Sequence, residues 1–270
     1  MIATLRRNFR IYGAIATLQP KLSLAYRAWF WSSIVLNTIA MAIYVFFWQA
    51  VYAGQTTIAG LDMQQTINYI LLAQIFLPIA DGFLLWEFGY NLREGRIAVE
   101  LLRPVNMRAN YYTQYLSNML AFLAWNIPMA MVATFLFGLR WPTDLTTWVV
   151  FAITVVLGRT VLYFFDWALA CVTFYTTEVW GLGVLVMGFG LFASGALVPL
   201  VMMPTWLQGI LRMLPFAQVV YVPISLLSGI IPISEAPGLW LVQIAWIIGL
   251  SIFSQYFFRI AIRKVTVQGG

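Results

Sequence analysis

The sequence predicts an all-α, polytopic membrane protein. Only 9% of its 270 residues are charged and 62% are hydrophobic, whereas a globular domain carries roughly 25% charged residues. No charge falls between Arg27 and Asp62, between Arg108 and Arg140, or between Glu178 and Arg212. Uncharged apolar runs of this length are typical of membrane spans, which need about 20 residues each. These observations exclude a soluble enzyme and a disordered chain.

The residue types that are missing exclude several chemistries. The chain has no histidine, so it offers no imidazole for acid–base catalysis or metal binding. Cys171 is the single cysteine, which rules out an intrachain disulfide and a cysteine metal cluster. The two lysines, Lys21 and Lys264, follow Pro20 and Arg263, whereas a phosphate-binding P-loop requires a Gly-Lys pair. We therefore expect a non-catalytic chain with no metal site and no cofactor of its own.

Six apolar segments are long enough to span a membrane. They lie at 26–52, 64–89, 109–138, 146–174, 179–201 and 238–259. We find no internal repeat, so a secondary transporter built from inverted repeats is not favoured. The whole chain, 1–270, is therefore interpreted as a single transmembrane domain.

Basic residues predict the orientation of these spans, because Lys and Arg accumulate on the cytoplasmic side. With the N-terminus inside, twelve basic residues lie in the inner segments: Arg6, Arg7, Arg10, Lys21, Arg27, Arg93, Arg96, Arg103, Arg108, Arg259, Arg263 and Lys264. Only Arg140 and Arg212 lie in the outer segments. Both termini are therefore expected in the cytoplasm. The net charge of +6 reflects this orientation and does not indicate a nucleic-acid partner.

Two inner segments are predicted to form short helices outside the spans. In residues 1–20, Ile2, Leu5 and Phe9 recur at helical spacing, which favours a helix lying in the membrane interface. The alternative is a basic tail that only orients the chain. The loop 91–106 holds the densest cluster of charges and an amphipathic stretch that Pro104 should end. Such a helix can dock on a soluble partner, and the alternative is a solvated loop.

The outer segment 202–229 is too apolar for a loop in water. Pro204, Pro215 and Pro223 divide it into pieces too short to span a membrane. Two short re-entrant helices fit this pattern, provided that protein covers their backbone ends. The alternative is a seventh, poorly formed span, which would place the basic C-terminus outside.

Three ionisable residues, Asp81, Arg159 and Asp166, are predicted to lie inside the membrane, where charge is costly and often functional. Arg159 and Asp166 are seven residues apart and share one helical face. One hypothesis is an ion pair of Arg159 with Asp81 or Asp166 that joins spans two and four. The alternatives are direct contact with a polar or charged substrate, and snorkelling of Asp166 toward the interface.

Span five is rich in small residues that allow close helix contacts. They include Gly183, Gly188, Gly190 and Ser194. Tight packing within the chain explains them, and so does a seam with a second subunit, where a pathway would open.

The order of these features resembles the membrane subunit of an ABC-2-type ABC exporter, in its small six-span branch. The resemblance covers nearly the whole chain. It is carried by the stretch Arg93-Glu94-Gly95-Arg96 with Glu100-Leu101-Leu102-Arg103-Pro104-Val105-Asn106, by Pro204-Thr-Trp-Leu-Gln with Leu214-Pro215-Phe216, and by the closing Arg263-Lys264-Val265 with Gly269-Gly270.

The resemblance implies how such a chain works. The loop 91–106 would contain the coupling helix that contacts the ATPase, through Glu94, Gly95, Arg96, Ile97, Glu100, Leu101, Leu102, Arg103 and Pro104. Two cytoplasmic ABC ATPase subunits would bind the ATP and Mg²⁺, and a second permease would complete the pathway, in a heterodimer rather than a homodimer. The expected location is a bacterial plasma (inner) membrane, in contact with membrane lipid. The rival interpretation is a secondary transporter or channel that works without an ATPase.

Overall fold

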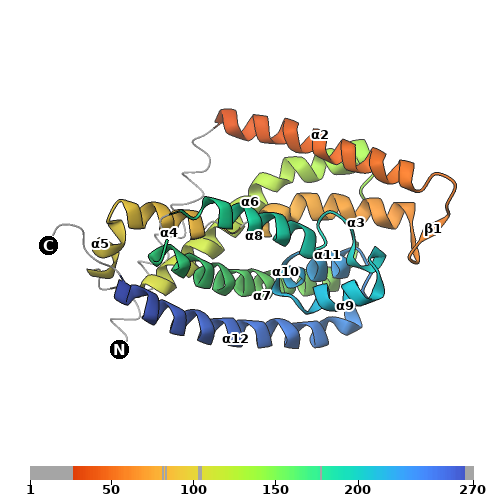
Figure 1. Ribbon diagram of the computed structural model, residues 1–270. Coiled ribbons are helices and arrows are strands. Elements are labelled where there is room, and N and C mark those ends of the chain that lie inside the picture. Colours follow the sequence, from red (N-terminus) through yellow and green to blue (C-terminus); the bar gives the residue numbers. More distant parts are fainter. Residues whose placement is uncertain (1–26, 81, 83, 103–104, 177, 265–270) are drawn as a thin grey trace.

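The computed structural model describes residues 27–80, 82, 84–102, 105–176 and 178–264. This part of the chain is an all-α bundle whose long helices lie side by side, with one small β-hairpin at an end (Figure 1). The predicted interfacial helix at 1–20 lies outside the described residues.

Four long helices form the frame of the bundle. They are α2 (Arg27–Val51), α6 (Met107–Phe137), α7 (Leu145–Ala170) and α12 (Ala236–Ala261). Among the described residues, three stretches are long and apolar enough to cross a membrane: Trp31–Val51, Leu145–Phe174 and Ile233–Lys264. They coincide with three of the predicted spans. The count of six stays a prediction, because α6 as a whole is not among these stretches and the remaining apolar helices are shorter or bent.

Local signals explain the boundaries of α6 and α7. Asn106 caps α6 by accepting a hydrogen bond from the N–H of Ala109 at 3.0 Å. Gly138 ends α6 in the left-handed conformation, with φ of 68°. Asp144 then caps α7 by accepting from the N–H of Thr147 at 2.8 Å. The hydroxyl and the N–H of Thr147 together lower the pKa of the Asp144 carboxyl.

The second predicted span is not one continuous helix. α3 (Met63–Phe76) runs into a 3-10 turn, η1 (Leu77–Ala80), and α4 (Leu84–Arg93) begins beyond a break. Pro78 lies in this turn, and proline removes a backbone donor and clashes with the preceding helical turn. The break therefore divides the predicted span 64–89 into two shorter helices.

A hairpin connects α2 to α3. Its strands, β1 (Thr57–Ile58) and β2 (Leu61–Asp62), pair antiparallel around Ala59 and Gly60, which both have positive φ. The hydroxyl of Tyr52 donates to the carbonyl of Leu61 at 3.0 Å and fixes the hairpin against the end of α2.

The fifth predicted span, 179–201, contains a shorter helix. α8 (Trp180–Ala193) stops before Gly195, which has φ of 77° and a carbonyl that accepts from the hydroxyl of Tyr69 at 2.9 Å. A left-handed residue ends an α-helix, and after it the chain continues into the 3-10 turn η3 (Leu200–Met202).

Short helices occupy the outer segment 202–229, as the proline spacing indicates. They are α9 (Thr205–Met213), α10 (Pro215–Val219) and α11 (Tyr221–Leu227). α9 meets the stretch Pro215–Leu227 at a bend of 72°, which fits a broken span as well as a re-entrant pair. The turn η4 (Ile233–Glu235) leads into α12, and the turns η2 (Cys171–Phe174) and η5 (Ile262–Lys264) follow α7 and α12. Re-entry from the outer side stays a prediction.

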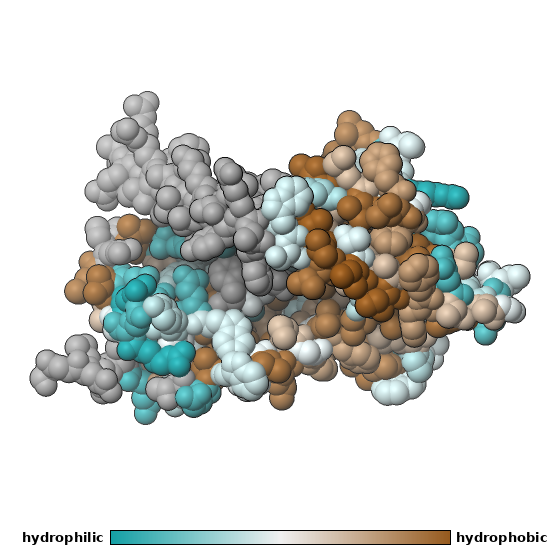
Figure 2. Space-filling model, turned by 90° about the horizontal axis from the view of Figure 1, so that it is seen from above, coloured by the Kyte–Doolittle hydropathy of each residue, from teal (hydrophilic) through white to brown (hydrophobic). Residues whose placement is uncertain are grey.

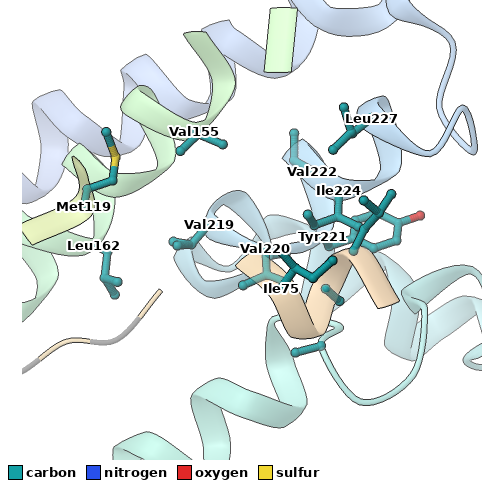
Figure 3. Close-up of a cluster of buried hydrophobic side chains, with 14 of the residues drawn as sticks. Ile75, Met119, Val155, Leu162, Val219, Val220, Tyr221, Val222, Ile224 and Leu227 are labelled. Atoms are coloured by element: carbon teal, nitrogen blue, oxygen red, sulfur yellow. The ribbon is translucent and has the colours of Figure 1, made fainter. Parts of the chain in front are cut away.

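α7 lies at the centre of the bundle and packs against α12, α10, α11 and α4. Figure 3 shows the core where Ile75 and Val155 lie close to the apolar residues of α10 and α11, among them Val219 and Leu227. Gly158 permits this packing, because a Cβ there would lie 2.5 Å from the carbonyl oxygen of Gln218. On the surface in Figure 2, hydrophobic residues cover the middle and hydrophilic residues gather at both ends. This distribution is typical of a protein that spans a membrane.

Candidate functional site

A cavity of about 310 Å³ lies between α4, α7, α8 and α10. Most of its walls are apolar, and three aromatic side chains line it: Trp86, Phe165 and Phe216. Among the described residues of its lining, Asp166 is the only ionisable side chain. The cavity therefore combines mostly apolar walls with a buried acid, which is the composition expected of a binding site for a small organic molecule.

Asp166 is held in place by neighbouring helices. Its side chain is only 6% exposed, and its Oδ2 accepts a hydrogen bond from the hydroxyl of Tyr115 on α6 at 2.8 Å. Gly82, in the chain before α4, lies so close that a Cβ at that position would overlap the Asp166 carboxyl. Glycine is therefore needed beside the acid, and the predicted membrane charge has a fixed position at the cavity wall.

Arg159 lies behind Asp166 and does not line the cavity. It is fully buried, and its guanidinium carbon lies 3.5 Å from the centre of the Tyr115 ring, a cation–π contact. Tyr115 thus touches both charged residues, one through its ring and one through its hydroxyl. Asp81 lies outside the described residues, and the ion pair of Arg159 with Asp81 or Asp166 stays a prediction.

The small residues predicted to form a seam all line this cavity: Gly183, Gly188, Gly190 and Ser194. Gly183 touches the ring of Trp86 so closely that a Cβ would overlap it. A Cβ at Gly190 would lie 3.2 Å from Cδ1 of Phe216. These contacts bring α8 against α4 and α10, which explains part of the glycine content as packing within the chain.

The opposite side of α8 is uncovered in the single chain. Leu185 and Phe192, which do not line the cavity, are 66% and 42% exposed. In a membrane, either lipid or another subunit covers such a face. The seam with a second permease is not tested by this arrangement and stays a prediction.

The end of the bundle that is predicted to face the cytoplasm carries a short helix within the predicted loop 91–106. α5 (Arg96–Leu102) turns away from α4 at Gly95, whose φ of 69° favours glycine. Ile97 is buried, whereas Leu102 is 86% exposed and Val99 is 57% exposed. α5 is thus fixed by one apolar side chain and presents others outward.

Charged residues flank this exposed surface. Glu94 and Arg96 form an ion pair of 2.6 Å at the start of α5. Glu94 also raises the pKa of Tyr90 by accepting a hydrogen bond from the phenol. Leu101 is half-exposed, whereas Arg103 and Pro104 lie outside the described residues. The predicted coupling residues therefore divide into an exposed group and an anchoring group.

Glu100 and Tyr111 connect α5 to α6. Glu100 accepts a hydrogen bond from the hydroxyl of Tyr111 at 3.0 Å, and the same hydroxyl accepts from Asn91 at 3.2 Å. Residues from the end of α4, from α5 and from the start of α6 therefore meet at the hydroxyl of Tyr111.

Arg108 continues this connection from the first turn of α6 to α12. Its guanidinium donates to Gln255 at 2.7 Å and to the carbonyl of Ser251 at 2.9 Å, and it lies over the ring of Phe164 on α7. A displacement of α5 would thus reach α6, α7 and α12 through direct contacts.

Sequence reasoning missed Tyr115, Tyr111 and Trp86 as parts of these sites. A phenol within an apolar span is a signal in principle, because a buried hydroxyl needs a partner. The partners of Tyr115 and Tyr111 lie on other helices, so the sequence alone does not identify them.

Helices long and apolar enough to cross a membrane, a buried acid beside a cavity and a short amphipathic helix at one end are typical of a multi-pass membrane protein. The family model described as ABC-2 family transporter protein matches residues 38–269. The chain therefore belongs to the ABC-2 family. Members of this family are permease components that act with ATPase subunits and are generally non-catalytic. No curated protein sequence matches the chain.

Proposed function

We propose that this chain is the transmembrane permease subunit of an ATP-driven exporter. It forms the translocation pathway with a second permease and is coupled to two separate cytoplasmic ATPase subunits, which bind ATP and Mg²⁺. The observation that carries the proposal is the exposed apolar edge of α5, where Val99 and Leu102 extend from an otherwise charged inner end. Exposed apolar residues outside the membrane mark sites of protein association.

The contacts behind α5 supply a route for the coupling. When the ATPases close on ATP, they push on α5, and its anchors transfer the movement. Glu100 and Tyr111 transfer it to α6, and Arg108 transfers it to α12. Because packed helices move as rigid units, a small shift at α5 changes the arrangement of the spans around the cavity.

A second permease would cover apolar faces that the single chain leaves exposed. On α2, Leu36, Ile43 and Phe46 are each more than 60% exposed, and α8 presents a similar face. A heterodimer is favoured over a homodimer by the resemblance of this chain to permeases that pair with a different subunit. The location is the bacterial plasma membrane, with both termini in the cytoplasm according to the distribution of basic residues.

The test compares two leucines, one at each end of the bundle. Leu102 is 86% exposed on α5, and Leu145 is 76% exposed at the first turn of α7, on the side that no cytoplasmic ATPase reaches. We expect Leu102→Glu to reduce the ATP hydrolysis that co-purifies with the chain by about tenfold or more, because a charge in a desolvated contact is a large loss. Leu145→Glu should leave it unchanged.

Two results contradict the proposal. One is the absence of any P-loop ATPase from the purified complex of the unaltered chain. The other is full ATP hydrolysis in the Leu102→Glu complex, provided that the variant elutes at the same size as the unaltered chain in gel filtration.

A further inference from the structure

We propose that a second hollow, at the other end of the bundle from α5, binds a phospholipid with a zwitterionic head group, in which a phosphate is joined to an ammonium group. Arg140 binds the phosphate and Asp144 binds the ammonium group, while an apolar floor receives the start of the acyl chains. The site is separate from the cavity beside Asp166 and does not depend on the proposed transport function.

The hollow has a volume of about 380 Å³. Its walls come from three parts of the chain: the second turn of α3, the connection from α6 into the first turn of α7, and the end of α11 with the loop to η4. It lies near the end of the bundle that carries the β-hairpin, because α3 begins directly after β2 (Figure 1). Ligand pockets have volumes of about 300 to 1,000 Å³, so one head group fits.

Arg140 has a fixed backbone and a free side chain. The side-chain amide of Asn68 on α3 donates to the carbonyl of Arg140 at 2.8 Å and accepts from its N–H at 2.9 Å. The side chain of Arg140 is exposed and lines the hollow. Within the described part of the chain, its guanidinium has neither a hydrogen bond nor an ion pair. A guanidinium presents several donors in one plane that matches a phosphate, so Arg140 is suited to bind one.

Asp144 adds a negative charge to the same hollow. Its Oδ2 accepts hydrogen bonds from the N–H of Thr147 at 2.8 Å and from the Thr147 hydroxyl. These bonds lower the pKa of the Asp144 carboxyl, so it is ionised at neutral pH. An ionised carboxylate offers about four acceptor positions on its two oxygens. The bonds from Thr147 therefore leave room for an ammonium group.

The two charges do not neutralise each other. Arg140 and Asp144 both line the hollow, yet the ion pair seen among the described residues joins Glu94 to Arg96 at the opposite end. A purely anionic ligand would be repelled by Asp144, and a purely cationic ligand by Arg140. A ligand that carries both signs is complementary to the hollow.

The rest of the lining favours a lipid over a free zwitterion. Leu226, Leu227 and Ile231 are buried residues that form an apolar floor. Trp141 lines the hollow and stacks on Trp148 with ring centres 5.7 Å apart. Tryptophans are enriched at the level of the lipid head groups. Charged groups beside an apolar floor and interfacial indoles match a phospholipid, whose charged head continues into apolar chains.

The experiment measures lipid binding to the purified full chain in detergent by native mass spectrometry. Dioleoyl-phosphatidylethanolamine and dioleoyl-phosphatidylglycerol have the same chains and the same phosphate, but only the first carries an ammonium group. The variants are Arg140→Gln, which keeps both backbone bonds to Asn68, and Asp144→Asn, because asparagine also caps helices well. The matched control is Arg259→Gln, an exposed arginine in the last turn of α12, whereas the hollow lies before the first turn of that helix.

We expect the unaltered chain to bind the ethanolamine lipid about fivefold more tightly than the glycerol lipid, since single exposed charge contacts contribute modestly. Asp144→Asn should abolish this preference by weakening only the ethanolamine lipid. Arg140→Gln should weaken both lipids about threefold to fivefold, and Arg259→Gln should leave both unchanged. Soluble glycerophosphoethanolamine, the same head group without acyl chains, should not displace the bound lipid.

Four results overturn the proposal. They are equal binding of the two lipids by the unaltered chain, an equal loss of both lipids in Asp144→Asn, no greater loss in Arg140→Gln than in Arg259→Gln, and displacement of the lipid by glycerophosphoethanolamine. Gel filtration shows whether each variant keeps the size of the unaltered chain. The comparison of the two lipids on the unaltered chain needs no variant, so the proposal can fail even if a substitution disturbs the fold.

Discussion

α7 and α8 are both apolar helices, yet their surroundings differ. α7 is surrounded by α12, α10, α11 and α4 and buries Thr154, Arg159 and Asp166. α8 buries only Gly183 and Ala193 along its length and exposes large apolar side chains to the outside. Because lipid is as apolar as leucine, apolar character does not mark the interior of a membrane protein, whereas polar side chains do.

The difference also separates a rigid part of the molecule from an adaptable one. The contacts of α7 leave no space at Gly158, whereas a Cβ at Gly181 or Gly188 on α8 would meet no atom within 4 Å. The cavity lies where the two helices face each other. A wall that has few neighbours can move against a fixed one, which is the arrangement a pathway needs.

The largest expected effect comes from comparing two glycines. Gly158→Ala on α7 should destabilise the protein by about 3 kcal/mol, because the new Cβ would lie 2.5 Å from the backbone carbonyl of Gln218 and backbone cannot rotate away. Gly181→Ala on α8 meets no atom within 4 Å and should stabilise the helix by roughly 0.5 kcal/mol. Unfolding titrations in detergent measure both, and equal stabilities would remove the contrast between the two helices.

A smaller effect is expected at Tyr115, which contacts both Arg159 and Asp166. Tyr115→Phe keeps the ring beside Arg159 and removes the hydrogen bond to Asp166, which should cost about 2 kcal/mol because the acceptor is a buried acid. Tyr112→Phe removes a bond between two neutral hydroxyls, at 2.9 Å to Thr160, and should cost about 1 kcal/mol. If the two variants unfold alike, Asp166 does not depend on Tyr115.

The smallest loss of stability is expected for a substitution on the exposed face of α8. Leu185 is 66% exposed, so Leu185→Ala should change the stability of the single chain by less than about 0.5 kcal/mol. Leu162 on α7 is 7% exposed, and Leu162→Ala should cost about 3 kcal/mol. The α8 variant should weaken pairing with a second permease, measured by cross-linking in membranes. Unchanged pairing would instead assign this face to lipid.

Much of the fold could be predicted from the lengths of the apolar runs and from the prolines that separate helices. The predicted spans 26–52 and 238–259 correspond to α2 and α12 within a few residues, because an uncharged apolar run has few other solutions in a membrane. Pro204 and Pro215 bound α9, as their spacing indicates. The short helix α5 lies inside the predicted inner loop, since its charges and apolar residues alternate at helical spacing.

Other features depend on contacts between distant residues. The early end of α8 at Gly195 is stabilised by Tyr69, whose hydroxyl donates to the Gly195 carbonyl from 126 positions away in the chain. No local pattern signals such a partner. The all-α architecture agrees with the prediction, whereas the helices within the predicted spans 64–89 and 179–201 are shorter than predicted.

The sequence by itself determined the class of the protein, an apolar bundle of membrane helices, because the membrane as a solvent limits where charge and polar backbone can lie. It also identified Arg159, Asp166 and the small residues of α8 as unusual. Only the tertiary structure decided that Asp166 and those small residues line one cavity while Arg159 lies behind Tyr115. The physical reason is that helical spacing fixes which residues share a face, whereas the neighbour of that face is selected by packing over the whole chain.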